Sequence, residues 1–166
     1  MPILDANTFE FISRSPDQTR RIGMRLGEFL HPADIVCLNG ELGAGKTTLV
    51  QGIARGWGSS DLVTSPTFVL VNNYHRPDGS EMNHLDAYRL ENALEAEDLD
   101  LERLIAEGPL LVEWADRVKA ALPMECLVIS MSWVSDEHRR LSFKFTGDRY
   151  GKLLDQLKNG MVMSFK

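Results

Sequence analysis

The sequence has only two cysteines, Cys37 and Cys126, and each lies inside an apolar segment. Two thiols without close spacing form neither a disulfide framework nor a zinc motif. Long apolar runs are missing too, because no segment approaches the roughly 18 residues that cross a membrane. The first residues show no basic cluster followed by an apolar stretch. We therefore expect a cytoplasmic protein that is neither exported nor inserted in a membrane.

Positive charge is also scarce, since 18 Lys and Arg face 24 Asp and Glu, for a net charge of −6. Proteins bind nucleic acid largely through clustered Lys and Arg that release counterions from the phosphates, so we do not expect a broad RNA-binding surface. The composition is otherwise that of a globular protein, with 43% hydrophobic and 25% charged residues. Without an internal repeat or linker, the 166 residues predict one domain spanning 1–166.

A glycine-rich segment at residues 40–48 carries the most specific chemical signal. The pattern of glycine, four residues, glycine, lysine and threonine follows a short apolar run and opens a segment with helical apolar spacing. In that arrangement, backbone N–H groups and a helix N-terminus bind phosphate oxygens. A tight turn beside a solvent-exposed lysine is the alternative. We predict binding of ATP and Mg²⁺, with Lys46 at the terminal phosphates, the Thr47 hydroxyl on the metal, and nucleotide contacts along Gly40, Glu41, Leu42, Gly43, Ala44, Gly45, Lys46, Thr47 and Thr48.

Two acidic residues are candidates to work with this segment. Glu113 follows the apolar run 110–112, the position from which a carboxylate reaches the magnesium ion of a phosphate loop. Asp86 and His84 fall on the same face of a predicted strand, where Asp86 could hold the water shell of magnesium or orient the attacking water. For both acids the alternative is a carboxylate in solvent at a strand end.

The apolar periodicity predicts an α/β fold of the P-loop type: a three-layer domain whose mixed, mostly parallel sheet includes an antiparallel hairpin and has helices on both faces. Ser15, Pro16 and Gln18 form a helix start, with a capping box and proline in the first turn. The predicted strands are residues 35–38, 67–74, 81–87, 110–112, 126–131 and 141–145, with helices after the glycine-rich segment, within 91–107 and at the C-terminus.

Two missing sequence features narrow the possible nucleotide and reaction. Guanine-specific proteins carry an Asn-Lys-x-Asp or similar motif, which does not occur here, so ATP is favoured over GTP. A small-molecule kinase needs a lid with paired arginines, whereas these arginines are scattered; Arg139 and Arg140 fit a solvated strand edge better than a nucleotide contact. Ser65-Pro66-Thr67 is a candidate segment for sensing the terminal phosphate. An ATPase is the preferred interpretation, and a P-loop kinase or a nucleotide-dependent interaction switch stay open as alternatives.

Four motifs, in this order, resemble the bacterial TsaE (formerly YjeE) ATPases, which take part in making threonylcarbamoyladenosine beside the anticodon of tRNA. The resemblance covers about residues 15 to 123. The motifs are Leu38-Asn39-Gly40-Glu41-Leu42-Gly43-Ala44-Gly45-Lys46-Thr47-Thr48, Ser65-Pro66-Thr67-Phe68, His84-Leu85-Asp86-Ala87-Tyr88-Arg89 and Glu113-Trp114.

The resemblance implies an ATP-hydrolysing subunit that binds the TsaD–TsaB heterodimer and meets tRNA only through that complex. It implies magnesium ligands at Thr47 and Glu113, and catalytic roles for Lys46 and Asp86. Family members usually carry tyrosine after Ser-Pro-Thr, where this sequence has Phe68, so any role of that hydroxyl is lost here.

Overall fold

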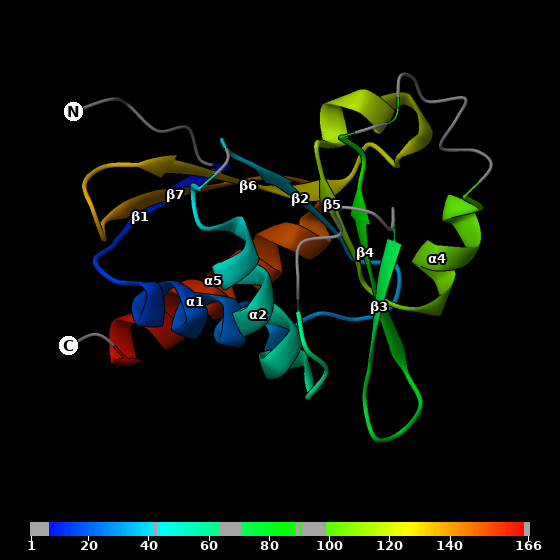
Figure 1. Cartoon of the computed structure of the whole chain (residues 1–166), viewed down its shortest axis with the longest axis horizontal. Coiled ribbons are helices and arrows are strands. Elements are labelled where there is room, and N and C mark those ends of the chain that lie inside the picture. Colours follow the sequence, from blue (N-terminus) through cyan, green and yellow to red (C-terminus); the bar gives the residue numbers. More distant parts are fainter. Residues whose placement is uncertain (1–6, 42, 64–70, 89, 91–98, 165–166) are drawn as a thin grey trace.

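The computed structural model of the chain describes residues 7–41, 43–63, 71–88, 90 and 99–164. A mixed sheet of seven strands runs through this part of the chain in the order β1-β7-β6-β2-β5-β4-β3 (Figure 1). The four central strands β6, β2, β5 and β4 are parallel, and antiparallel pairing occurs toward both edges. The strands are β1 (Thr8–Ser13), β2 (Ile35–Asn39), β3 (Val71–His75), β4 (Glu81–Asp86), β5 (Leu110–Glu113), β6 (Cys126–Trp133) and β7 (Arg139–Thr146).

Helices cover both faces of the sheet and make three layers. One face packs against α1 (Pro16–Glu28), α2 (Lys46–Trp57) and α5 (Asp148–Ser164), and the other against α4 (Leu101–Glu107) and the 3₁₀ segment η1 (Ala115–Ala121). Alternate residues of β2 supply the two cores: Val36 and Leu38 face α2, whereas Ile35 and Cys37 face the other way. The predicted α/β fold of the P-loop type is confirmed. Of the helices within the described residues, none is long and apolar enough to traverse a bilayer.

Local signals fix the start of α1. The Ser15 hydroxyl accepts a hydrogen bond from the Gln18 N–H (3.1 Å), and Pro16 opens the helix, as predicted. The Gln18 side chain reaches back to the N–H of Arg14 (2.7 Å), one residue before the cap. The helix ends at Glu28, slightly earlier than the expected end near His31 and Pro32.

Close packing of α1 on α2 depends on glycine. A Cβ atom on Gly27 would lie 2.1 Å from the Ile53 carbonyl oxygen, and one on Gly52 would lie 2.2 Å from that of Arg20. Only residues without a Cβ allow the two backbones to approach this far. Because α2 begins at Lys46, this contact also fixes the position of the glycine-rich segment.

Most predicted elements are present. The hairpin turns at residues 76–79, where the Arg76 N–H donates to the Ser80 carbonyl (3.0 Å). The C-terminal helix and the strands at 35, 81, 110, 126 and 141 are confirmed within a few residues. Residues 67–70 of the predicted hairpin and 91–98 of the predicted acidic helices lie outside the described residues, while α4 confirms the helix after them. The sequence analysis missed β1, an edge strand of mostly half-buried residues, and the 3₁₀ segment η1, which has no clear apolar period.

Candidate nucleotide-binding site

The glycine-rich segment, residues 40–47, connects β2 to α2 and has the backbone of a phosphate loop. Gly40, Gly43 and Gly45 have φ angles of 154°, 84° and 102°, and Gly45 caps the helix in the left-handed region. A Cβ on Gly40 would lie 2.8 Å from the Met131 carbonyl oxygen, so glycine is needed for space as well. Helix α2 begins without a side-chain cap and without an acidic residue in its first turn, which leaves its N-terminus suited to an anion. Leu42 lies outside the described residues.

Lys46 points into the site and not into solvent. Its Nζ donates to the Gly40 carbonyl (2.7 Å), lies 3.9 Å from Oε1 of Glu113, and is 5.2 Å from the centre of the Trp114 ring. Only 11% of the side chain is exposed. The ammonium group is therefore held at the mouth of the loop, which contradicts the alternative of a solvent-exposed lysine.

The two predicted acids lie side by side at the carboxyl ends of parallel strands. Asp86 is opposite Glu113 in the β4–β5 register, and Leu38 of β2 is opposite Glu113 from the other side. Glu113 is only 6% exposed, so it is not a solvated strand end. The structure thus brings Lys46, Glu113 and Asp86 together at the carboxyl ends of the central parallel strands, beside the first turn of α2.

A buried hydrogen-bonded chain holds Glu113. Its Oε2 lies 2.8 Å from Nε2 of His84, and the Tyr74 hydroxyl lies 2.9 Å from Nδ1 of the same ring. A carboxylate can only accept, so Nε2 of His84 carries the hydrogen of this bond. Burial, together with the nearby charge of Glu113, raises the pKa of Tyr74 to about 12, which keeps its hydroxyl protonated. One oxygen of Glu113 is therefore fixed, while Oε1 faces Lys46.

Asp86 has a different environment. Its Oδ1 accepts from the Tyr88 N–H (2.9 Å). Burial is the main cause that raises its pKa, and the Glu113 charge adds to this, while the Tyr88 hydrogen bond and the charges of His84 and Lys46 oppose it. Asp86 and His84 share the strand face predicted for them, because they alternate along β4 with Leu85, which points to the core on the other face.

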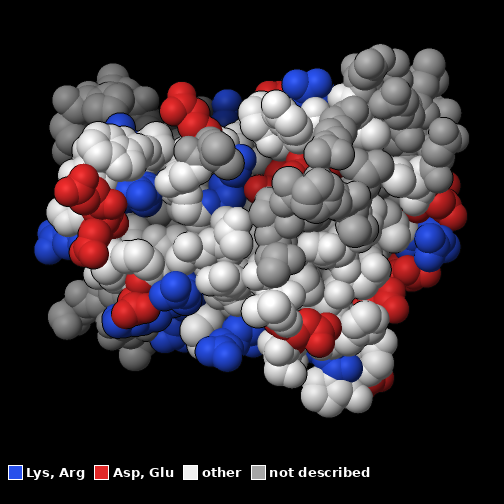
Figure 2. All heavy atoms as spheres, viewed as in Figure 1, with Lys and Arg blue, Asp and Glu red and all other residues white. Residues whose placement is uncertain are grey.

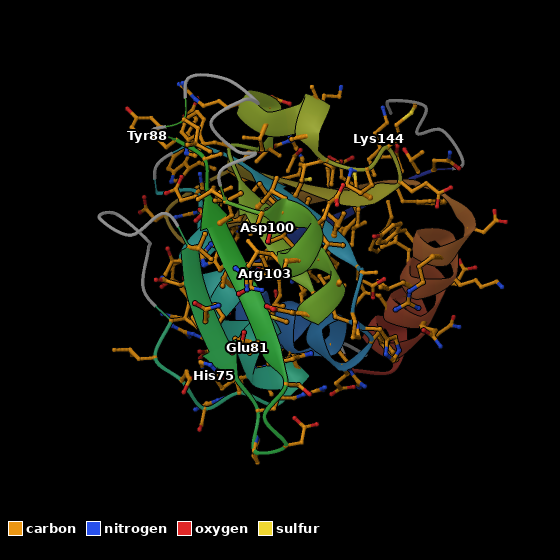
Figure 3. The ribbon with its side chains drawn as sticks, turned by 90° about the vertical axis from the view of Figure 1, so that its right-hand side faces the viewer. His75, Glu81, Tyr88, Asp100, Arg103 and Lys144 are labelled. Carbon is orange, nitrogen blue, oxygen red and sulfur yellow. The ribbon has the colours of Figure 1, made fainter. Side chains whose placement is uncertain are left out.

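Aromatic residues cover the carboxylate side of the site. The Trp114 ring lies 5.0 Å from that of Tyr88, and the Arg117 guanidinium lies 5.6 Å from the Tyr88 ring centre. Figure 3 shows Tyr88 at the opposite end of β4 from Glu81, far from the hairpin turn beside His75. Trp114 adopts a left-handed backbone (φ 59°), which turns the chain sharply after Glu113. Sequence reasoning gave Trp114 only a packing role and did not anticipate Tyr74 at all.

Two hollows flank the phosphate loop. One, of about 340 Å³, is lined by Leu38, Asn39, Gly40, Glu41, Lys46, Trp114 and Asp116. The other, of about 600 Å³, is lined by Gly40, Glu41, Gly43, Ala44, Met131, Ser132 and Trp133. Arg139 also reaches the loop, with its Nη2 3.5 Å from the Gly43 carbonyl, whereas Arg140 pairs with Glu10 of β1 (2.9 Å). Strand β7 lies between β1 and β6, so the expectation of a strand edge is wrong for both arginines: Arg140 is exposed on a paired strand, and Arg139 approaches the loop.

The donor set fits magnesium better than a metal held by protein alone. Among the described residues no three His, Cys, Asp or Glu side chains gather around one point. Mg²⁺ usually takes one or two protein oxygens and completes its shell with phosphates and water. The Thr47 hydroxyl in the first turn of α2 and Oε1 of Glu113 are suitable ligands of this kind. Ser65-Pro66-Thr67, Phe68 and Arg89 lie outside the described residues.

This combination defines a P-loop nucleotide-binding protein: a buried parallel strand, a glycine loop, a lysine at the helix start and a strand-end carboxylate on the neighbouring strand. Comparison with known proteins agrees. The family model described as "Threonylcarbamoyl adenosine biosynthesis protein TsaE" matches residues 13–141, and the chain belongs to this family.

Individual relatives support the assignment over most of the chain. The tRNA threonylcarbamoyladenosine biosynthesis protein TsaE of Bacillus subtilis is 39% identical over 145 residues, covering 86% of this chain and 89% of that protein. The protein of the same name from Streptomyces coelicolor is 39% identical over 137 residues, covering 79% and 93%. The crystal structure of YdiB from Bacillus subtilis superposes with a TM-score of 0.75 at 32% identity, covering 92% of this chain and 95% of that one.

Proposed function

We propose that this chain is the ATP-binding and ATP-hydrolysing subunit required for threonylcarbamoyladenosine modification of tRNA at the adenosine beside the anticodon. It acts in the cytoplasm, as a single domain, with a TsaD–TsaB heterodimer. The observation that carries the proposal is the placement of Lys46 against Glu113 across a phosphate loop, in a chain that belongs to the TsaE family.

The residues divide the work of hydrolysis. Backbone N–H groups of the loop and the N-terminus of α2 bind the phosphates, and Lys46 exchanges the Gly40 carbonyl for phosphate oxygens. Thr47 and Glu113 would hold Mg²⁺, which when bound would supply positive charge beside the phosphates. Asp86 orients the attacking water. Its carboxylate lies at the end of the strand next to Glu113, so it can reach the site while Glu113 serves the metal.

Contact with tRNA is expected to be indirect. On the face shown in Figure 2, acidic and basic residues are interspersed over the described surface, and the chain carries a net charge of −6. Phosphate binding by a protein surface needs a concentration of Lys and Arg. A partner protein that binds the tRNA, with this chain docked on that partner, would explain how a net acidic chain takes part in tRNA modification.

The deciding experiment measures phosphate release by the purified chain alone and then with TsaD–TsaB and tRNA. The proposal predicts strong stimulation in the complete mixture and none with the Lys46→Ala variant. Transfer of phosphate to a metabolite would instead indicate the kinase alternative. Complex formation that depends on nucleotide, with modification continuing when ATP is replaced by a non-hydrolysable analogue, would indicate an interaction switch.

A further inference from the structure

The two cysteines, distant in sequence, are neighbours on one face of the sheet. Cys37 lies in β2 and Cys126 begins β6, the parallel strand beside it. Cys37 is opposite Val128 in the register, so Cys126 is two residues away on the same face. Both side chains belong to the core that packs against η1 and not to the core under α2.

The two thiols differ in accessibility. Cys37 is 4% exposed, whereas Cys126 is half-buried. Both line a cavity of about 520 Å³, together with Lys119 and with Met124, which is 89% exposed at the outer rim. A small reagent entering this cavity therefore meets Cys126 first.

The surroundings prepare the two sulfurs for different roles. Hydrogen bonding with the neighbouring Cys37 thiol, opposed by burial and helped by the charge of Lys119, lowers the pKa of Cys126 to about 7. The same hydrogen bond, together with burial, raises the pKa of Cys37. Cys126 is thus the more readily ionised and more nucleophilic thiol, and Cys37 holds its proton more tightly.

We propose that Cys37 and Cys126 form an oxidant-reactive dithiol, in which a small hydroperoxide entering the cavity reacts at Cys126 and Cys37 resolves the product to a disulfide. The Cys126 sulfur attacks one peroxide oxygen, the O–O bond breaks, and water (or an alcohol) leaves as Cys126 becomes a sulfenic acid. The Cys37 sulfur then attacks the Cys126 sulfur, the S–O bond breaks, and a second water leaves. The peroxide accepts two electrons in total, and the two thiols lose them.

The location connects this chemistry to the candidate nucleotide site. The dithiol cavity shares Asn39 and Asp116 with the smaller hollow beside the phosphate loop. Cys37 precedes Gly40, where the loop begins, by three residues. The inference itself does not depend on the proposed function, since it rests on the placement of the two cysteines on one face of adjacent strands and on the cavity that both line.

The first test measures alkylation of the reduced full-length protein by iodoacetamide as a function of pH, with mass spectrometry to distinguish the two cysteines. We expect the rate at Cys126 to be half-maximal near pH 7 and far above that at Cys37. The Cys37→Ala variant should shift this midpoint upward toward the value of roughly 8.5 for an ordinary thiol. A midpoint near that ordinary value in the unchanged protein, or no shift in the variant, would overturn the proposal.

The second test adds hydrogen peroxide at equimolar and tenfold concentrations. The unchanged chain should lose two hydrogens and give a linked peptide pair containing Cys37 and Cys126. Cys37→Ala should instead accumulate a sulfenic acid at Cys126, which dimedone traps, and Cys126→Ala should not react. If Cys37→Ala does not fold, as judged by circular dichroism, Cys37→Ser serves in its place. Oxidation of the unchanged chain that stops at sulfenic or sulfinic acid without the linked peptide would refute the resolving role of Cys37.

Discussion

His84 Nε2 and Glu113 Oε2 are joined across neighbouring strands by a buried hydrogen bond of 2.8 Å. His84 is itself 1% exposed and contacts the Tyr74 hydroxyl through its other nitrogen. The imidazole therefore holds Oε2 of Glu113 and leaves Oε1 facing Lys46. Hydrogen bonds of this kind orient metal ligands, and losing one commonly lowers metal affinity by roughly 10- to 100-fold.

From this bond we predict that His84→Gln weakens the Mg²⁺ dependence of ATP binding by about tenfold or more. Calorimetric titration of nucleotide at several Mg²⁺ concentrations measures it. His75→Gln is the matched control, because that histidine is exposed at the far end of the hairpin (Figure 3) and its side chain pairs with Asp61 and Glu81, away from Glu113. Equal Mg²⁺ dependence in the two variants would show that His84 does not position Glu113.

Lys46→Ala should lower the rate of ATP turnover by roughly 100-fold or more, to a level close to background. The reason is that no second cation replaces its charge among the described residues within the hollow beside Trp114. Phosphate release at saturating ATP provides the measurement, with Lys144→Ala, an exposed lysine of β7, as the control. Turnover near that of the unchanged chain would remove the phosphate-loop assignment.

The two strand-end acids should separate in paired measurements. Glu113→Gln removes a charge beside Mg²⁺, so Mg²⁺-dependent ATP affinity and turnover should both fall. Asp86→Asn should leave affinity almost unchanged while turnover falls by roughly 10²- to 10⁴-fold, because orienting water matters mainly in the transition state. If both variants lose Mg²⁺-dependent affinity equally, both acids belong to the metal site.

The environment of Asp86 also predicts how the stability of the fold depends on pH. Burial raises its pKa above the value of 3.8 for an ordinary aspartate, so the folded state holds the proton more tightly than the unfolded state does. Stability is then lost as the pH rises from 3.8 through the higher folded pKa. Asp86→Asn should remove this loss and unfold at a higher temperature than the unchanged chain at pH 7, with a smaller difference below pH 4. A variant that is less stable at pH 7 would contradict the sign.

Gly27→Ala should destabilise the fold by several kcal/mol. An added Cβ would lie 2.1 Å from the Ile53 carbonyl oxygen, so the α1 and α2 backbones must separate. Overpacking typically costs about 1–3 kcal/mol where less rigid atoms can move. Gly160→Ala is the control, because its added Cβ would meet Arg25 side-chain atoms at ordinary distances of 3.5 Å or more. Thermal unfolding measures both. Similar midpoints would mean that the helix contact tolerates a side chain.

The sequence predicted the parts of the site that are continuous along the chain. Strand, glycine loop and helix around Lys46 follow from local apolar periods and glycine positions, and Glu113 follows from the end of a buried run. Strand alternation was sufficient to put His84 and Asp86 on one face. These relations need no knowledge of how the strands pair.

What the sequence did not predict depends on pairing. The contact of Tyr74 with His84 needs the β3–β4 register, and the contact of Cys37 with Cys126 needs β2 beside β6. Strand β1 was missed because it is an edge strand of mostly half-buried residues. The approach of Arg139 to Gly43 likewise requires β7 to be placed across β6 from the loop.

The sheet order also dictates when each part of the molecule can form during synthesis. Among the described strands, β1 pairs with β7 alone, so Thr8 has no partner until Lys144 has been synthesised. The phosphate-loop strand and both strands that carry the acids are complete by Glu113. The strands around the candidate nucleotide-binding site therefore leave the ribosome before β6 and β7, and β1, the first strand to emerge, is among the last to join the sheet. Until β6 and β7 arrive, one edge of β2 stays unpaired, and this is the interval in which the nascent chain most needs protection from aggregation.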